Sequence, residues 1–272
     1  MIQKIHFVML MIGQNNMIDL KSFLLNKNSG ITFSFLTPIY FLTLIFMAII
    51  LLLILINEKK IINCLKNNEK KFRIIIGTFL LFAYILRRGT FILFGFYNWR
   101  FHLDINFCSF VNILFIIYCF SGNKKLYTLC YYMVFIGPFF AIIFPSISSS
   151  IFNYSFLNFI IIHHFIFIFN YLFLQINDIK FSIKQIIKVN LFIMIFVMGT
   201  YIFNYIFGTS YNLFYSFISS KLLNIGIFNS ILENKILSIL SLLFLNYIVV
   251  LVAIFCLKWT IRKKELAMWK KY

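Results

Sequence analysis

Long apolar runs separated by short clusters of charge constrain this chain more than any other feature of its sequence. Of its 272 residues, 62% are hydrophobic and only 12% are charged, and the mean hydropathy is +0.94. A water-soluble domain has roughly half of its residues apolar and about a quarter charged. Runs of about 20 apolar residues are long enough to cross roughly 30 Å of hydrocarbon as α-helices. We therefore expect an all-α, polytopic transmembrane helix bundle.

Seven apolar runs predict about seven membrane spans. They cover Thr37 to Asn57, Ile74 to Gly95, Leu103 to Ser121, Leu126 to Pro145, Ser155 to Gln175, Val189 to Phe207 and Ile236 to Leu257. The segment from Glu58 to Arg73 is predicted to be a basic loop between the first two spans. The chain then divides into an amino-terminal interfacial segment (1–36), the bundle (37–257) and a basic cytoplasmic tail (258–272).

The net charge of +18 comes mainly from Lys and Arg residues in the loops between the apolar runs. Nucleic-acid binders carry their Lys and Arg as a stripe on a soluble surface, so this pattern argues against a nucleic-acid partner. With the amino terminus outside, the inside segments hold 17 Lys and Arg and the outside segments hold 6. The positive-inside rule therefore predicts an outside amino terminus and a cytoplasmic carboxyl terminus in the cell membrane.

The five cysteines are scattered and form no C-x-x-C pair. Most lie inside predicted spans, so neither a disulfide framework nor a zinc site is indicated. We expect no metal and no cofactor, and the sequence identifies no protein partner. Cys108 differs from the other four because polar residues precede it, whereas Cys64, Cys119, Cys130 and Cys256 read as packing residues or an idle thiol.

Polar groups inside predicted spans are costly and usually mark function. Arg87 and Arg88 lie about 10 Å from the outer end of the second span at 1.5 Å per residue. Asp104, Asn106 and Cys108 open the third span. His163 and His164 lie roughly 12 to 14 Å from the outer end of the fifth span by the same rise. All three groups are therefore expected in the outer half of the bilayer.

These residues also have purely structural readings. A membrane cysteine is most often a small packing residue, and two histidines can simply hydrogen-bond between helices. The arginines can pair with Asp104 or extend toward the interface. As a functional set they supply a nucleophile, a base and an anion binder. That chemistry requires the Cys108 sulfur within about 4 Å of a nitrogen of His163 or His164.

Three segments resemble one membrane-protein family. The run LDINFCSFVNILFIIYCFSGNKKLY resembles the third helix of the YwaF-like family, which extends to the eukaryotic transmembrane protein 164 acyltransferases. IIHHFIFIFNYLFL stands where that family has its intramembrane histidine. FNYIFGTSYNLFY resembles its Gly-Thr-Asn-Tyr-like stretch, with Ser210 in place of Asn. The family commonly has Pro and His before the cysteine, where this chain has Asp104 and Asn106.

The resemblance implies a helical acyltransferase whose membrane cysteine takes an acyl chain from a phospholipid and passes it to a lysophospholipid. Cys108 matches the nucleophile, and His163 or His164 matches the base. Arg87, Arg88, Asp104, Asn106 and Tyr211 are the expected substrate-binding residues, and membrane phospholipids are the expected partners.

Two other functions remain open from the residues. A small-solute transporter or substrate-binding membrane subunit would use the arginines for an anionic ligand and the histidines for coupled protonation. It would tolerate the loss of Cys108. A non-enzymatic scaffold would tolerate changes at all three polar places.

Overall fold

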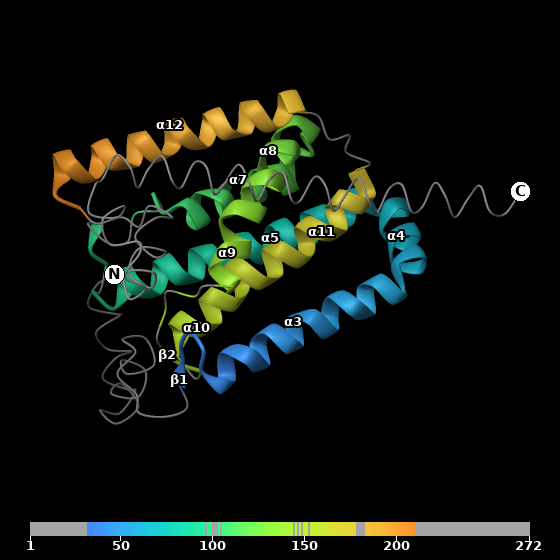
Figure 1. Cartoon of the computed structure of the whole chain (residues 1–272), viewed down its shortest axis with the longest axis horizontal. Coiled ribbons are helices and arrows are strands. Elements are labelled where there is room, and N and C mark those ends of the chain that lie inside the picture. The colour runs from blue at the N-terminus through green and yellow to red at the C-terminus, as the bar shows by residue number, and fades with distance from the viewer. Residues whose placement is uncertain are drawn as a thin grey trace, which may run out of the picture.

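The computed structural model describes residues 32–95, 97–99, 103, 105–143, 145, 147, 149–151, 153–177 and 183–209. These residues form an all-α fold with one pair of two-residue strands. The helices are α3 (Pro38–Ile56), α4 (Glu58–Asn67), α5 (Glu69–Leu93), α7 (Phe107–Ser121), α8 (Lys124–Ile136), α9 (Pro138–Ile143), α10 (Tyr154–Phe159), η1 (Ile160–Phe165), α11 (Ile166–Asn177) and α12 (Ile183–Phe207). In Figure 1, α3 and α12 lie on opposite sides of the other helices.

Within the described residues, five helical segments are long and apolar enough to span a membrane. They are Pro38–Ile56, Glu69–Leu93, Lys124–Ile143, Tyr154–Asn177 and Lys184–Phe207, and they confirm five of the predicted spans. The third predicted span appears as the shorter apolar helix α7. The seventh, Ile236 to Leu257, lies outside the described residues, as do residues 1–31 and the tail 258–272. The count of seven and the placement of the termini remain predictions.

The prediction of a loop from Glu58 to Arg73 is wrong, because this segment is helical. It forms helix α4 and the first turn of α5. Ile61 and Leu65, four residues apart, are partly buried against the bundle, while the lysines occupy other positions of the helix. This is the amphipathic pattern of a surface helix, so the sequence did carry a helical signal beneath its high charge.

An aromatic core holds α7, α8 and α11 together. Tyr118, Tyr127 and Phe173 are buried and pack ring against ring, with centroids 4.6 to 6.2 Å apart. The Asn177 side-chain amide donates to the Tyr118 hydroxyl over 2.8 Å, and the Tyr127 hydroxyl donates to the Asn170 carbonyl over 2.7 Å. The Tyr118 and Tyr127 hydroxyls thus both have a partner, as is usual for buried aromatic hydroxyls.

The antiparallel helices α5 and α7 approach closely at Gly77. A Cβ placed there would lie 2.7 Å from the Cys119 Cβ, and small residues of this kind let transmembrane helices pack tightly. Four residues earlier, Arg73 Nε donates to the Cys119 carbonyl over 2.9 Å. These two contacts define the register between the helices.

Strands β1 (Thr32–Phe33) and β2 (Ser149–Ser150) pair antiparallel beside the first turn of α3. Phe33 is fully buried against Tyr40, Phe156 and Phe159. The described end of the predicted interfacial segment, residues 32–36, therefore packs on the bundle. Pairs of two residues leave no alternating pattern in a sequence, so the strands were not predicted.

Candidate functional site

His163 and His164 lie in the π-helical segment η1, between α10 and α11 of one long span. A π-helix hydrogen-bonds from residue i to i+5, which widens the helix, and such segments occur frequently at functional sites. Sequence analysis placed the pair at mid-span but gave no sign of the wider turn. Because of the helical rotation, the two imidazoles point in different directions.

His163 has a fixed ring orientation. Its Nδ1 atom lies 2.9 Å from the Phe159 carbonyl oxygen, and its ring packs on that of Phe159 with centroids 4.5 Å apart. A carbonyl only accepts hydrogen bonds, so Nδ1 carries the proton and Nε2 is left as an acceptor. The positive charge of Arg87 on α5 also acts on this imidazole. His163 is therefore close enough to Arg87 for the two charges to interact.

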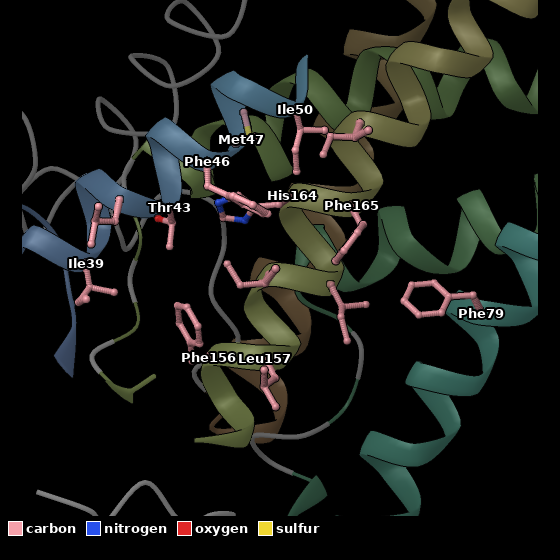
Figure 2. A pocket seen from close by; sticks show the side chains of 14 residues that line it. Ile39, Thr43, Phe46, Met47, Ile50, Phe79, Phe156, Leu157, His164 and Phe165 are labelled. Carbon is pink, nitrogen blue, oxygen red and sulfur yellow. The ribbon is translucent and has the colours of Figure 1, made fainter. Parts of the chain in front are cut away.

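His164 is buried, with 6% of its surface exposed, and neither ring nitrogen has a hydrogen-bond partner among the described residues. Buried polar groups are normally satisfied, and each exception calls for an explanation. Figure 2 shows the ring directed from η1 toward α3, on the side of Thr43 and Phe46. The His164 ring therefore points to a different part of the bundle from the His163 ring.

A groove of about 530 Å³ lies in front of His164, and we refer to it as the α3 groove. Its volume falls in the range of roughly 300 to 1,000 Å³ typical of small-molecule sites. Thr43 and His164 line it, but the surface that they and the other lining residues expose in the groove is apolar. The complete lining is Ile39, Leu42, Thr43, Phe46, Met47, Ile50, Phe79, Phe156, Leu157, Ile160, Ile161, His164, Phe165 and Ile168.

Cys108 lies in the first turn of α7 and is half-buried. Its Sγ is next to Gly137, since a Cβ on that glycine would lie 3.5 Å from the sulfur. Helix α7, which carries the cysteine, packs against η1, which carries the histidines. No hydrogen bond joins Cys108 to His163 or His164 in the described part of the chain, so the expected sulfur–nitrogen contact is not formed in this state.

The arginine pair reaches the level of the cysteine along the α5–α7 contact. Eleven positions separate Gly77 from Arg88 on α5 and also Cys119 from Cys108 on α7, so antiparallel packing places Arg88 and Cys108 at similar depth. The Arg88 guanidinium lies 5.9 and 5.7 Å from the ring centroids of Tyr84 and Tyr97. These cation–π contacts hold it among aromatic rings.

Only one of the other three predicted site residues lies in the described part of the chain. Asn106 is the N-cap of α7, and its side chain makes no capping hydrogen bond. Asp104 and Tyr211 lie outside the described residues. Among the residues that the structure describes, no group of three His, Cys, Asp or Glu is arranged to hold a metal ion.

Two buried asparagines were missed by the sequence reasoning. Asn112 is four residues after Cys108, on the same face of α7, and its Oδ1 has no hydrogen-bond partner in the part of the chain that the structure describes. Asn170 on α11 finds no hydrogen-bond partner for either side-chain polar atom within the described ranges. A polar residue inside an apolar span was the available signal for both, but asparagine is so frequent throughout this chain that these two did not stand out.

Comparison with known proteins identifies the family. No match was found among curated proteins or among solved structures. The model of the TMEM164 family matches residues 32–263, which include all the described helices and the Cys108 and His163–His164 positions. The chain therefore belongs to the TMEM164 family of membrane proteins.

Proposed function

We propose that this protein is an acyltransferase of the cell membrane, in the YwaF-like branch of its family, that moves a fatty acyl chain between phospholipids through a thioester on Cys108. One observation carries the proposal. A half-buried cysteine in the first turn of α7 lies on a helix that packs against the π-helical turn bearing two histidines. A nucleophile and a base from adjacent elements form the basic constellation for covalent acyl transfer.

The reaction has two balanced steps. The Cys108 thiolate attacks the ester carbonyl carbon of a phospholipid, and the ester C–O bond breaks as the lysophospholipid leaves with a proton. The free hydroxyl of a second lysophospholipid then attacks the thioester, and the C–S bond breaks as the thiol regains its proton. A histidine takes the thiol proton in the first step and the hydroxyl proton in the second.

His163 is the better placed of the two histidines for the proton transfers. The Phe159 carbonyl holds its Nδ1 proton, which leaves Nε2 free to accept another. The absence of a bond to Cys108 does not exclude it, because catalytic hydrogen bonds often form only with substrate bound. For proton transfer, the Cys108 thiol and the His163 imidazole must come within hydrogen-bond distance of each other.

Negative charge on the reacting carbonyl oxygen has two sources of stabilisation. The first-turn amides of α7 surround Cys108, and the Asn106 side chain does not cap them. Helix amino termini stabilise anions through such amides and the helix dipole. The Arg87 side chain, whose charge already acts on His163, adds a cation suited to a phosphate group.

A transfer assay tests the proposal. The full-length protein, in nanodiscs, receives phosphatidylcholine with a labelled acyl chain and an unlabelled lysophospholipid acceptor. Cys108→Ala and Cys108→Ser abolish label transfer, while Cys64→Ala, which changes an exposed cysteine on α4, leaves it at the wild-type rate. Transfer by Cys108→Ala at the wild-type rate rules the thioester route out.

A second function, binding or transport of an anionic solute, draws support from the interrupted helices. The span Lys124–Ile143 is broken between α8 and α9 at Gly137, and α9 packs on η1. Paired interrupted helices line binding sites in many transporters. This function predicts that Arg87→Gln with Arg88→Gln abolishes solute uptake into proteoliposomes, while Cys108→Ala leaves uptake intact.

A further inference from the structure

We propose that four lysines of α4 and α5 bind the head groups of anionic phospholipids in the membrane leaflet at that end of the bundle. The four, which we call the α4–α5 lysine patch, are Lys59, Lys60, Lys70 and Lys71. A lipid held at this patch is a stabilising partner and not a substrate. The inference therefore does not depend on the acyl transfer proposed above.

Helix α4 lies at the ends of three membrane-spanning segments. It connects α3 to α5 and packs on α11, and Figure 1 shows it at the end of the bundle where α3 finishes and α5 begins. Its 10 residues extend about 15 Å at 1.5 Å per residue. The same tetrapeptide, Asn-Glu-Lys-Lys, occurs at 57–60 and at 68–71. A pair of lysines consequently lies at each end of α4.

The positive charge of the patch is not compensated by any acidic side chain that the structure describes. The described residues include only two acids, Glu58 and Glu69. Glu69 pairs with Arg73 at 3.0 Å, and Glu58 is close enough to the Tyr171 hydroxyl on α11 to interact with it. The four lysines are all exposed, and none of them forms an ion pair within the described ranges. The patch is therefore complementary to an anionic partner.

Exposed aliphatic side chains beside the lysines indicate that this partner is a lipid. Ile56, at the end of α3, is 71% exposed and precedes Lys59 by three residues. Ile75 on α5 is 56% exposed and follows Lys71 by four residues. Such side chains on spanning helices contact lipid hydrocarbon, so lysines within about one turn of them reach the depth of the head groups. Clusters of about four to eight basic residues in this position bind anionic lipids.

The patch is remote from the candidate functional site. Arg73, in the turn that follows Lys70 and Lys71, donates a hydrogen bond to the carbonyl of Cys119 near the carboxyl end of α7. Cys108 lies eleven residues earlier on α7, about 17 Å away at 1.5 Å per residue. A head group at the patch is therefore at the other end of α7 from the cysteine.

Native mass spectrometry of the full-length protein tests the lipid preference. The protein is released from nanodiscs that contain equal amounts of phosphatidylglycerol and phosphatidylcholine with identical acyl chains, and the ratio of the two bound lipids is measured. We expect the wild type to retain more phosphatidylglycerol than phosphatidylcholine. Replacing all four patch lysines by Gln should lower the ratio about threefold or more, and replacing them by Arg, which keeps the charge, should preserve it.

A matched control removes the same charge elsewhere. It replaces four other exposed lysines, on α8 and α12, by Gln: Lys124, Lys125, Lys184 and Lys188. This variant should keep most of the preference for phosphatidylglycerol. An equal loss in the two glutamine variants would overturn the proposal, because the preference would then belong to the total charge of the protein and not to the patch.

The wild type alone provides two further tests, which do not depend on the folding of any variant. Equal retention of phosphatidylglycerol and phosphatidylcholine would overturn the proposal, because the lysines would then be only solvated. Glycerol 3-phosphate, added in excess, carries a phosphate group without acyl chains. We expect it to leave the bound phosphatidylglycerol in place, and displacement of the lipid would show that the patch binds soluble phosphates instead.

Discussion

Arg73 on α5 donates a hydrogen bond from its Nε to the carbonyl oxygen of Cys119 on α7, 2.9 Å away. The same guanidinium pairs with Glu69 at 3.0 Å and lies 5.9 Å from the centre of the Tyr118 ring. A cation at a helix carboxyl terminus is favourable because the unpaired carbonyls there carry partial negative charge. Arg73 therefore links α5 to the carboxyl-terminal end of α7, the helix whose first turn carries Cys108.

We expect Arg73→Ala to lower the free energy of unfolding by about 2 kcal/mol, since hydrogen bonds to charged groups contribute roughly 1.5 to 3 kcal/mol. Thermal unfolding of the detergent-purified protein measures the change. Lys71→Ala, an exposed position on the same helix, is the control and should have little effect. Equal unfolding temperatures for the two variants would show that the Arg73 contacts carry no net stability.

Close packing of α5 on α7 predicts opposite outcomes for two glycines of α5. Gly77→Ala places a Cβ 2.7 Å from the Cys119 Cβ, whereas Gly89→Ala places one where nothing lies within 4 Å. Overpacking costs about 1 to 3 kcal/mol, so Gly77→Ala should destabilise by that amount and Gly89→Ala should not. The same unfolding assay decides it, and a tolerated Gly77→Ala would contradict the observed helix contact.

The aromatic core predicts a measurable coupling between Tyr118 and Asn177, which share a 2.8 Å hydrogen bond. Tyr118→Phe and Asn177→Ala, alone and together, form a double-mutant cycle. Hydrogen bonds between membrane helices average about 0.6 kcal/mol in such cycles, with a maximum near 1.7 kcal/mol. A coupling energy in this range supports the bond, and strict additivity of the two changes would argue that it contributes nothing.

How much of this arrangement could be predicted depended on the strength of the local pattern. The apolar spans were predicted well because lipid requires uninterrupted apolar helices. The α4 helix was missed because its lysines suggested a loop, although Ile61 and Leu65 marked one buried face. The sequence also singled out Cys108 and both histidines by their cost inside a membrane.

The remaining features depend on tertiary structure. The α3 groove joins Thr43 to His164 across helices far apart in the sequence, and no local pattern encodes that meeting. The wider π-helical turn that carries His163 and His164 is not indicated by the residue types either. The predicted contact between the Cys108 sulfur and a histidine also depends on how the helices pack. No such hydrogen bond is present among the described residues.

The two histidines should give different kinetic defects. His163→Ala should lower the rate of acyl transfer about 10²- to 10⁴-fold, the usual contribution of a positioned acid–base group. His164→Phe should change kcat and KM much less, because both of its ring nitrogens are buried. Steady-state assays over a range of acceptor concentrations separate the two effects. Identical defects in kcat and KM would mean that the histidines act as one unit.

Gly137 should matter to the reaction because it faces the nucleophile. A Cβ at this position would lie 2.7 Å from the buried Phe107 ring and 3.5 Å from Cys108 Sγ. Gly137→Ala therefore forces a shift beside the sulfur and should slow acyl transfer. Gly199→Ala on α12, where no atom lies within 4 Å of the new Cβ, is the control and should transfer at the wild-type rate. Unimpaired transfer by Gly137→Ala would indicate that the reacting group is elsewhere.

Acylation of Cys108 itself tests the central claim most directly. The purified protein is incubated with phosphatidylcholine carrying an isotope-labelled acyl chain, without acceptor, and intact protein and peptides are examined by mass spectrometry with and without hydroxylamine. The account predicts one added acyl mass on the Cys108 peptide, removed by hydroxylamine and missing from Cys108→Ala. An unmodified Cys108 in protein that still transfers acyl chains, or an equal adduct in Cys108→Ala, would contradict it.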